Sequence, residues 1–439
     1  MSPEEAAARD VAARLRAAGF TAYLAGGYVR DRLLGVAPRD FDVATDAVPD
    51  AVQRLFPKTV PVGAQFGVVL VVIDGHAIEV ATFRSDAAYV DGRHPVAVRY
   101  GTPEDDAQRR DFTINGMFLD PVSDEVIDLV GGRRDLEARI IRAIGDPQAR
   151  LREDRLRMLR GVRLASRLGF EIEPATFAAM RAAAHTITDI AWERIGDEVV
   201  RMLTDSANGS ARRAFALLDA TGLLAPILPE VAALRAVEQS PDYHPEGDVF
   251  VHTLLLLEQL EQPAEPLALG ALLHDVGKPQ CAVRGERRIT FFGHCELGAE
   301  MAVTICQRLR RSRETRERVH YLVRNHLRPL QAPEMRTSTL KRFLAQDGID
   351  QLLELARLDA LASTGDLRAY AFCRTKLAEL GAARLKPAPL LRGQDLIGLG
   401  FRPGPLFRDI LDAVTDAQLD GTLETRDDAL AWVRARYPH

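Results

Sequence analysis

The hydrophobic pattern changes in kind along the chain. Residues 3–19 carry apolar side chains at helical spacing and end at a glycine, which predicts one amphipathic helix. Residues 66–73 and 76–83 are rich in apolar and β-branched side chains and flank an Asp-Gly pair, which predicts a hairpin. From Asp135 onward, almost every apolar repeat has helical spacing. We therefore expect a small head that mixes strands and helices, followed by a long all-helical part.

Polar stretches divide this pattern. Residues 85–108 are polar and rich in turn-forming residues, which predicts a long loop, and residues 240–248 form a proline- and acid-rich break. Strand-like segments at 118–119 and 126–129 complete the head. We expect a head, a helical neck and body, a second helical domain and a helical tail, which span residues 1–140, 141–240, 241–385 and 386–439.

Composition places the chain in a broad class. With 47% hydrophobic and 27% charged residues, the 439-residue chain is typical of a globular protein with more than one domain. No run of about 18 apolar residues predicts a membrane span, and the first residues lack the pattern of a signal peptide. The four cysteines show no paired spacing, which favours a reduced cytoplasm and argues against a cysteine zinc site.

Overall charge says little about partners. The net charge of −5 does not by itself indicate a nucleic-acid binder. Nearly all positive charge is arginine, which favours bidentate contacts to phosphates and base edges. A GC-rich gene produces the same bias without any function, so charge has to be judged motif by motif.

The first candidate site lies near the start of the chain. Gly26 and Gly27 open a predicted short helix, and Asp40 and Asp42 follow on an extended segment. Because side chains alternate along a strand, both carboxylates point the same way and can bind a hard cation such as Mg²⁺. Paired glycines let backbone N–H groups approach phosphates. Glu79, in the hairpin, is either a third carboxylate beside this pair or a solvent-facing strand residue. The motif indicates metal-assisted phosphoryl or nucleotidyl transfer.

Two charged motifs follow. The segment 109–117, RRDFTINGM, is either an ordinary capped helix or a site for a triphosphate and ribose. Farther on, the residues at positions 153, 154, 157 and 160 sit at offsets that share one helix face, for which a solvated ion-pair face is the usual explanation. Taken alone, neither motif defines a function.

These motifs occur in an order that resembles a known family. The GG-x-VRD turn, the Asp40/Asp42 pair, RRDFTIN and the ED-x-x-R-x-x-R motif together resemble the class II tRNA nucleotidyltransferase and bacterial poly(A) polymerase family. The likeness covers the first half of the chain. It implies a polymerase-beta-like mixed β-sheet head, then an all-helical neck, body and tail. It also implies nucleotide addition to an RNA 3′ end from CTP, ATP or both, without a nucleic-acid template. We expect addition of C and A to the 3′ end of tRNA from CTP and ATP.

The resemblance also implies roles for individual residues. Asp40 and Asp42 would hold two Mg²⁺ ions, with Glu79 as metal support or as the base that deprotonates the hydroxyl. The nucleotide would be bound by residues from three segments of the chain: Gly26, Gly27, Arg30, Arg110, Asp111, Asn115, Glu153, Asp154, Arg157 and Arg160. Arginines of the neck, body and tail would grip the tRNA acceptor and T-arm. The oligomeric state is left open.

Base selection follows from hydrogen-bonding chemistry once that family is assumed. Asp154 accepts from the amino group of C or A, and Arg157 donates to the ring of either base. U and G lack that amino group at the required position, so both leave a buried polar group unpaired. In the family, a loop between the head strands is needed for terminal A addition. Its presence here, at residues 89–95, argues against an enzyme that adds only CC.

The second half carries an independent signal. Histidines and aspartates in the order H…HD…H…H…D resemble the HD-domain metal-phosphohydrolase superfamily, and imidazole with carboxylate suits Mn, Fe, Ni or Zn. The predicted ligands, including those expected of two-metal members, are His252, His274, Asp275, His294, His326 and Asp359. Lys278 either touches a substrate phosphate or caps a helix. The domain is either a catalyst or a site kept for RNA binding.

Three alternatives to full CCA addition stay open. In the first alternative, the chain adds only A to tRNA or acts as a poly(A) polymerase. Its short, mildly basic C-terminal end favours tRNA as the substrate. A second alternative is that HD hydrolysis of cyclic or terminal phosphates is the main activity. The third is a non-catalytic RNA-binding module, which the intact carboxylate pair and HD ligand set disfavour.

Overall fold

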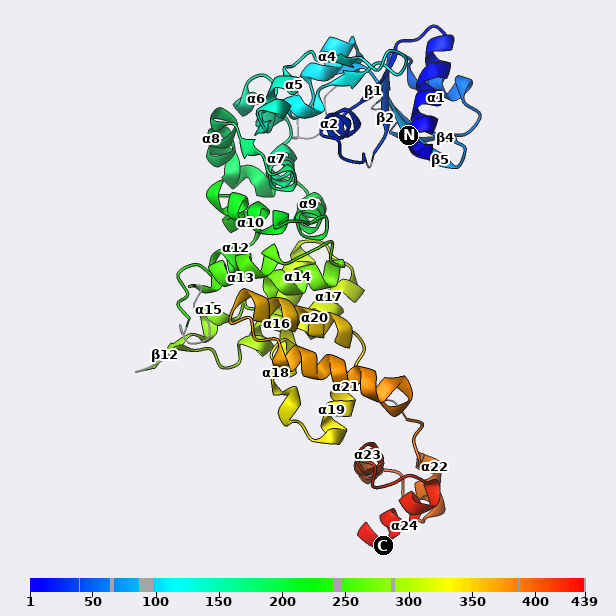
Figure 1. Ribbon diagram of the computed structural model, residues 1–439, viewed down its shortest axis with the longest axis vertical. Helices are drawn as coiled ribbons and strands as arrows, with labels where there is room; N and C mark the ends of the chain where they lie inside the picture. Colours follow the sequence, from blue (N-terminus) through cyan, green and yellow to red (C-terminus); the bar gives the residue numbers. More distant parts are fainter. Residues whose placement is uncertain are drawn as a thin grey trace. The chain divides into compact units, whose positions relative to one another are not determined.

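The computed structural model describes residues 1–38, 40–63, 67–86, 98–239, 247–285, 289–385 and 387–437. The chain divides into two compact units, Met1–Ala232 and Ala233–His439 (Figure 1). The first unit combines a mixed sheet with helices; within the described residues, the second is helical apart from one two-stranded sheet. This confirms the α+β fold class. No helix in the described ranges is both long and apolar enough to cross a membrane.

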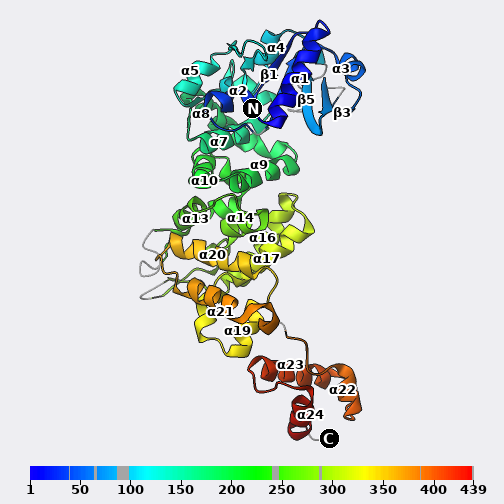
Figure 2. The same cartoon turned by 45° about the vertical axis from the view of Figure 1, so that its right-hand side comes forward.

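A seven-stranded sheet in the order β3-β4-β5-β2-β1-β8-β9 forms the base of the head. β2 and β5 pair in parallel, whereas every other neighbouring pair is antiparallel. Helix α1 covers the sheet with its apolar stripe, which includes the buried Val11 and Leu15 (Figure 2). The elements are α1 (Pro3–Ala17), β1 (Ala22–Ala25), α2 (Gly27–Leu33), β2 (Asp42–Thr45), α3 (Pro49–Leu55), β3 (Thr59–Gly63), β4 (Val68–Ile73), β5 (His76–Thr82), β8 (Phe118–Leu119) and β9 (Val126–Ile127).

The hairpin prediction is confirmed by β4 and β5. Asp74 and Gly75 form the two-residue turn, and both have positive φ, 48° and 83°. Such φ values match the twist of a tight hairpin, which explains the Asp-Gly pair. Along β4, side chains alternate between buried and half-buried positions, so one strand face serves the core.

The predicted loop at 85–108 is partly wrong. Its ends form a two-stranded sheet, β6 (Arg84–Asp86) and β7 (Val98–Tyr100), and the helix α4 (Pro103–Gln108). Thr102 and Asp105 cap α4 reciprocally, and proline occupies its first turn. This start signal is visible in the sequence but was missed among the polar residues. The segment 89–95 lies outside the described residues.

Helices of the neck and body complete the first unit. Helix α7 packs against α9 and α10, and at Gly161 it closely approaches the head. A Cβ atom at Gly161 would lie 2.8 Å from Phe112 Cζ and 2.5 Å from Met180 Cε, so glycine permits this contact. The elements are α5 (Gly132–Glu137), β10 (Ile140–Ile141), α6 (Pro147–Glu153), α7 (Leu156–Leu168), β11 (Glu171–Ile172), α8 (Pro174–Ala183), α9 (Trp192–Thr204), α10 (Ser210–Ala220), α11 (Leu224–Ile227) and α12 (Pro229–Ala232).

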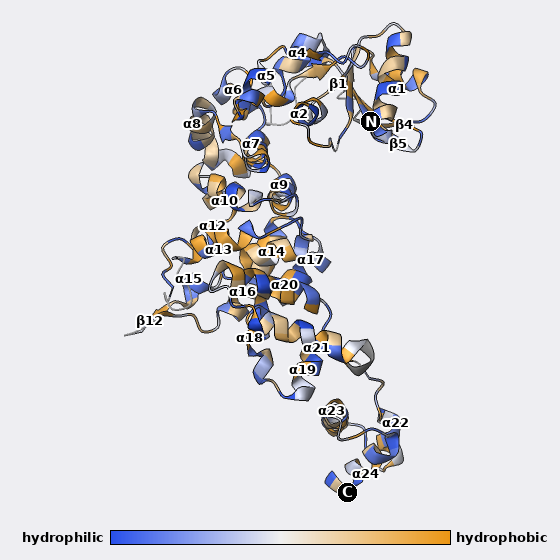
Figure 3. Cartoon of the chain, in the orientation of Figure 1, coloured by the Kyte–Doolittle hydropathy of each residue, from blue (hydrophilic) through white to orange (hydrophobic). Residues whose placement is uncertain are grey.

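The second unit is built around α14, whose residues 267–273 are all buried. Figure 3 shows this helix as hydrophobic on all sides, as expected for a helix enclosed by others, here α13, α17 and α20. Most of the predicted break at 240–248 lies outside the described residues, and the four-part division stays a prediction. The elements are α13 (Val249–Glu258), α14 (Glu265–Leu273), α15 (Lys278–Cys281), β12 (Val283–Arg284), β13 (Ile289–Thr290), α16 (His294–Arg308), α17 (Arg313–Asn325), α18 (Arg328–Gln331), α19 (Thr337–Leu344), α20 (Ile349–Ala362) and α21 (Arg368–Leu385).

Three further helices end the chain: α22 (Gly393–Gly398), α23 (Pro405–Leu419) and α24 (Arg426–Arg436). They enclose a small apolar core of their own, which includes Leu396, Ile410 and Val433. Polar contacts join α23 to α19: Lys341 Nζ donates to the Leu419 carbonyl at 2.6 Å. The three helices are therefore held together by a small apolar core, and polar contacts connect them to α19.

Candidate active site and metal centre

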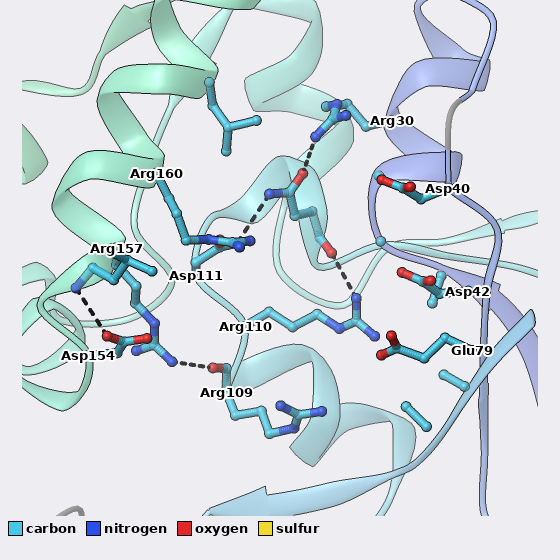
Figure 4. Close-up of a pocket in the computed structure, with 18 of the residues that line it drawn as sticks. Arg30, Asp40, Asp42, Glu79, Arg109, Arg110, Asp111, Asp154, Arg157 and Arg160 are labelled. Atoms are coloured by element: carbon cyan, nitrogen blue, oxygen red, sulfur yellow. Dashed lines mark hydrogen bonds and ion pairs between the residues drawn. The ribbon is translucent and has the colours of Figure 1, made fainter. Parts of the chain in front are cut away.

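Three carboxylates converge at one wall of a cavity of about 560 Å³ in the first unit (Figure 4). Asp42 begins β2 and lies opposite Glu79 in the parallel β2–β5 register. Asp40, two residues earlier, also lines the cavity. The pairing of β2 with β5 brings Glu79 beside the aspartates, although 37 residues separate it from Asp42 in the sequence. Glu79 is an exposed residue of β5 and also lies beside this pair, so its role as a third carboxylate stays a prediction.

These carboxylates destabilise one another. Burial raises the pKa of Asp42 to about 7, the charges of Glu79 and Asp40 add to the shift, and Arg110 opposes it. Burial and the charge of Asp40 also raise the pKa of Glu79. A divalent cation bound among these oxygens would remove the repulsion, and oxygen-only donors suit a hard ion. The predicted Mg²⁺ therefore fits this donor set.

The glycine pair lies directly beside these acids. Gly26 has φ 69° and ψ −135°, a conformation that side chains other than glycine rarely adopt. A Cβ atom there would lie 3.3 Å from Arg110 Nη1 and 3.5 Å from Asp42 Oδ2. Glycine thus leaves the space between the Arg110 guanidinium and the Asp42 carboxylate open, where β1 ends and α2 begins.

A chain of hydrogen bonds and ion pairs connects α2 to α7. Arg30 pairs with Asp31 at 2.7 Å and donates to Asn115 Oδ1 at 2.7 Å; Asn115 donates to Asp111 Oδ1 at 3.1 Å. Arg160 Nη2 lies 2.7 Å from Asp111 Oδ2. Burial alone would raise the pKa of Asp111, but the Arg160 charge and hydrogen bonds hold it well below its usual range. Arg30, Asn115, Asp111 and Arg160 line the cavity, whereas Asp31 is not among its lining residues.

Asp106 is a site-building residue that sequence reasoning missed. Its buried carboxylate accepts from Arg109 Nε at 2.8 Å and from Arg110 Nη2 at 2.9 Å. Arg110 also lies over the Phe118 ring, 5.1 Å from its centroid. Asp106 thereby orients both arginines. The sequence did contain a signal for this role. Asp106 precedes Arg109 by three residues and Arg110 by four, and on a helix an acid at these spacings can pair with both arginines.

We expect Asp106→Asn to lower the free energy of unfolding by about 1–3 kcal/mol at neutral pH, because a buried charged hydrogen bond is lost. Burial raises the pKa of Asp106, but Arg110 and Arg109 more than offset this, so the folded-state pKa is lowered. Its contribution is therefore present above the unfolded pKa and is lost as pH falls through the folded value.

Thermal unfolding at neutral and at acidic pH measures this difference. The gap between Asp106→Asn and the parent protein should shrink in acid. Glu104→Gln, at an exposed neighbouring position, is the matched control and should show no gap at either pH. A gap that stays constant with pH would show that the carboxylate charge is not responsible.

Asp154 interrupts the helix that the sequence predicts. The expected single helix face across residues 153–160 is wrong, because α6 ends at Glu153 and α7 begins at Leu156. Asp154 has extended backbone angles and accepts from the Leu156 N–H at 3.0 Å. Arg194, from α9, donates to Asp154 Oδ2 at 3.0 Å. A local cap and a distant arginine therefore place this carboxylate in the cavity wall.

Arg157 is held from two sides. Its Nη1 donates to Glu153 at 2.6 Å and to the Arg150 carbonyl at 2.8 Å. Its Nη2 donates to the Arg109 carbonyl at 3.0 Å, a contact drawn in Figure 4. Arg157 lines the cavity, whereas Glu153 is not among its lining residues. This arrangement indicates that Glu153 orients Arg157, and direct contact of Glu153 with a nucleotide remains untested.

The predicted HD residues come together in the second unit from five helices or helix ends. His252 Nε2 lies 3.0 Å from Asp359 Oδ1 and 3.3 Å from His274 Nε2. The ligand atoms of His252, His274 and Asp359 all lie within 4.8 Å of one another. His294 and His326 form a second group with Cys295, by the same measure. Cys295 was not predicted.

The histidines present the same nitrogen to this centre. His274, His294 and His326 each donate from Nδ1 to the backbone carbonyl three residues earlier, at 2.9, 2.7 and 2.7 Å. A neutral imidazole carries a single N–H, so each Nε2 keeps a lone pair for a metal ion. Burial lowers the pKa of His326 to about 4, so this imidazole is neutral at pH 7. The donor set fits a transition metal.

Asp275 lies between the two groups. Its Oδ2 is 3.1 Å from His274 Nε2, and its Oδ1 is 3.6 Å from His294 Nε2 and 3.8 Å from His326 Nε2. Burial alone would raise the Asp275 pKa, but neighbours including His274 and Lys278 hold it well below its usual range. Lys278 Nζ lies 2.6 Å from Asp275 Oδ2 and donates to Gln239, so its amine contacts side chains within this site.

Comparison with known protein families matches three parts of the chain. Residues 22–142 match the poly A polymerase head domain, and residues 169–234 match the probable RNA and SrmB-binding site of polymerase A. Residues 248–361 match the HD domain. The first match contains the three carboxylates of the head, and the third contains all six predicted HD ligands.

Two similar proteins share a name. The chain is 46% identical over 186 residues to the CCA-adding enzyme of Bacillus pumilus, which covers 42% of this chain and 46% of that protein. It is 42% identical over 233 residues to the CCA-adding enzyme of Geobacillus stearothermophilus, covering 53% and 56% of the two chains. These alignments therefore span only about half of each relative.

Solved structures extend the likeness to the whole chain. The Bacillus stearothermophilus CCA-adding enzyme in complex with CTP has a TM-score of 0.75 and 28% identity, covering 99% of this chain and 98% of that one. A Thermotoga maritima CCA-adding enzyme complexed with tRNA has a TM-score of 0.60 at 18% identity and covers 99% and 96%, which supports the fold alone.

The fold, the motifs and these matches define a nucleotidyltransferase-type head joined to an RNA-binding segment and an HD domain. The chain is therefore similar to CCA-adding enzymes and carries the three matched domains in sequence order, which confirms the resemblance predicted from its motifs.

Proposed function

We propose that this chain adds C and A nucleotides to the 3′ end of tRNA, taking them from CTP and ATP without a nucleic-acid template. One observation carries the proposal. A single cavity presents Asp40, Asp42 and Glu79 on one side, and Asp154 with Arg157 on another (Figure 4). The first group suits transfer of a nucleotidyl group, and the second suits selection of a base.

The three carboxylates supply the chemical end of the cavity. Mg²⁺, when held by Asp40 and Asp42, would stabilise the attacking and leaving oxygens of an in-line displacement at the α-phosphate. Glu79, whose pKa is raised by burial and by Asp40, is suited to accept the proton of the attacking hydroxyl. Arg110, held by Asp106, faces these acids and would bind the triphosphate, with Gly26 offering its open backbone.

Asp154 and Arg157 supply the base-selecting end. An ionised carboxylate can accept about four hydrogen bonds, so Asp154 keeps acceptor capacity beyond its bonds from Leu156 and Arg194. We propose that it accepts from the amino group of C or A while Arg157 donates to the ring. UTP and GTP would not offer Asp154 this amino group, which opposes their use.

Asp154→Ala should reduce the preference for CTP over UTP by about 10–100-fold, which corresponds to about 1–3 kcal/mol for one buried polar contact. The kcat/KM for each nucleoside triphosphate measures this ratio. Glu193→Ala, at an exposed acid of the neighbouring helix α9, serves as the control and should keep the parent ratio. An unchanged ratio in Asp154→Ala would refute the base-reading role.

The comparisons support this function by similarity. Relatives at 42–46% identity over part of the chain are CCA-adding enzymes, and a structural neighbour at 28% identity is such an enzyme in complex with CTP. The acceptor and T-arm of tRNA are therefore the proposed RNA partner. The cytoplasmic location expected from the sequence suits that partner and stays a prediction.

Extension of defined tRNAs tests the proposal. The purified full chain is given tRNAs that end before, within and after CCA, with CTP and ATP offered separately, and the products are sequenced. Stepwise completion of CCA supports the proposal. Addition of A only after CC would identify an A-adding enzyme, and long A tails on any RNA would overturn the tRNA assignment.

We propose a second activity, metal-dependent phosphohydrolysis by the HD domain. The observation that favours it is the convergence of imidazole nitrogens and carboxylates around Asp275. Imidazole with carboxylate suits Mn, Fe, Ni or Zn, and such an ion, when bound, would activate water toward a phosphate. Incubation of chelator-treated protein with each metal and with cyclic or terminal RNA phosphates tests this. Absence of hydrolysis with all four metals would leave only a binding role.

A further inference from the structure

Cys295 lies beside the second group of HD residues, where no HD motif residue was expected. We propose that Cys295 is a metal ligand that, with His294 and His326, gives one half of the HD centre a preference for thiophilic ions such as Zn²⁺, Co²⁺ or Fe²⁺. The proposal rests on the metal-binding role proposed above for the HD domain. It adds a ligand and a class of metal to that site.

The distances fit one shared ion. Cys295 Sγ lies 3.5 Å from His294 Nε2, and all three ligand atoms of this group lie within 4.8 Å of one another. A tetrahedral ion with a metal–nitrogen bond of about 2.1 Å and a metal–sulfur bond of about 2.3 Å separates the two donors by about 3.6 Å. The observed spacing is therefore the one that a shared ion requires.

The group of His252, His274 and Asp359 has donor atoms at the spacing of a tetrahedral ion as well. Two imidazole nitrogens on a tetrahedral ion lie about 3.4 Å apart, and His252 Nε2 and His274 Nε2 are 3.3 Å apart. Equal charges or two lone pairs at that distance repel one another unless a proton or a cation lies between them. Both groups thus have the donor spacing of an ion-binding site.

Sequence adjacency does not explain the contact between His294 and Cys295. They are the first two residues of α16, and neighbouring side chains on a helix diverge by about 100°. The bond from His294 Nδ1 to the Phe291 carbonyl turns the ring, so that Nε2 faces both Asp275 and the cysteine. Local backbone geometry before α16 therefore brings the two donors together.

The two halves of the centre differ in donor chemistry. The half around His252, His274 and Asp359 offers two nitrogens and a carboxylate, whereas the other half offers two nitrogens and a sulfur. Asp275 faces both halves through different oxygens. Sulfur ligands select soft or borderline ions over Mn²⁺ and Mg²⁺. The half with Cys295 should therefore be the more selective.

Cobalt spectroscopy of the full chain tests this assignment. Chelator-treated protein loaded with Co²⁺ should show a near-ultraviolet thiolate-to-cobalt charge-transfer band. Cys295→Ser should remove the band and weaken Co²⁺ binding at this half by about tenfold or more, while the half around His252 still binds. Cys281→Ser, at another half-buried cysteine, is the matched control and should keep the band.

Alkylation gives a second measurement on the same protein. Loading with Zn²⁺ should slow iodoacetamide labelling of Cys295, as read by peptide mass spectrometry, and leave the rate at Cys281 unchanged. Cobalt binding by the parent protein without a charge-transfer band would overturn the ligand role while keeping the metal site. Failure of the parent protein to bind any metal would overturn both proposals, so the two failures are distinguishable.

Discussion

Asp42→Asn should reduce nucleotide addition to tRNA by about 10³-fold, because metal and charge stabilisation of the transition state contributes several kcal/mol. Asp42 begins β2 directly opposite Glu79, so its loss leaves the cation with one carboxylate fewer at the centre of the group. Folding should not suffer. Burial and Glu79 raise the pKa of Asp42 in the protein without metal, so the neutral side chain relieves repulsion. Single-turnover addition of C measures the loss, and thermal unfolding measures the fold.

Two control variants show whether the loss of nucleotide addition is specific to Asp42. Asp50→Asn, at an exposed position on α3, should keep full activity. That result would show that removal of a head carboxylate does not by itself lower nucleotide addition. Asp275→Ala should keep nucleotide addition and lose any hydrolysis by the HD domain, whereas Asp42→Asn should keep that hydrolysis. Loss of both activities in either variant would contradict two separate sites. Near-normal addition by Asp42→Asn would remove Asp42 from the catalytic group.

Gly277→Ala should remove metal from the HD centre and destabilise the second unit by about 1–3 kcal/mol, the usual cost of overpacking. A Cβ atom at Gly277 would lie 2.8 Å from the Gly298 backbone nitrogen and closer still to the His294 carbonyl oxygen. Both obstacles are backbone atoms of α16, so a side-chain rotation cannot remove the clash. The first turn of α16 must shift, and this turn carries His294 and Cys295.

Bound metal per chain and thermal unfolding both report this effect. Gly398→Ala is the matched control, because a Cβ atom there has no neighbour within 4 Å. The control should keep its metal and its unfolding temperature. Full metal content in Gly277→Ala would show that α16 accommodates the methyl group, and the tight contact would then have no role in placing His294. Nucleotide addition at the head should persist in both variants.

Turns and helix ends were predictable because their signals are local. Asp74 and Gly75 predicted the hairpin, since their backbone angles fit few other residues. The order of motifs predicted the family, and the spacing of apolar residues predicted the helical second half. Helix α4, which was not predicted, also has a local signal, the Thr102–Asp105 capping box, so it was predictable from the sequence.

The helix break at Asp154 shows where local reasoning failed. The charges at positions 153–160 suit one helix face, and no proline or glycine marks an interruption. At the break, Asp154 accepts from the Leu156 N–H and also pairs with Arg194, which is 40 residues away in the sequence. A contact of that kind competes with helix continuation only once α9 has packed beside α7.

The sequence by itself therefore determined the kinds of element, the candidate residues and the family. Tertiary structure decided which of these residues meet: Glu79 faces Asp42 because β2 and β5 pair in parallel, and Cys295 reaches the HD centre because the backbone before α16 turns His294 toward it. The physical reason is the sequence distance over which each kind of interaction acts. Backbone preferences and hydrophobic periodicity act over a few residues, whereas strand register and side-chain convergence arise from packing between distant segments.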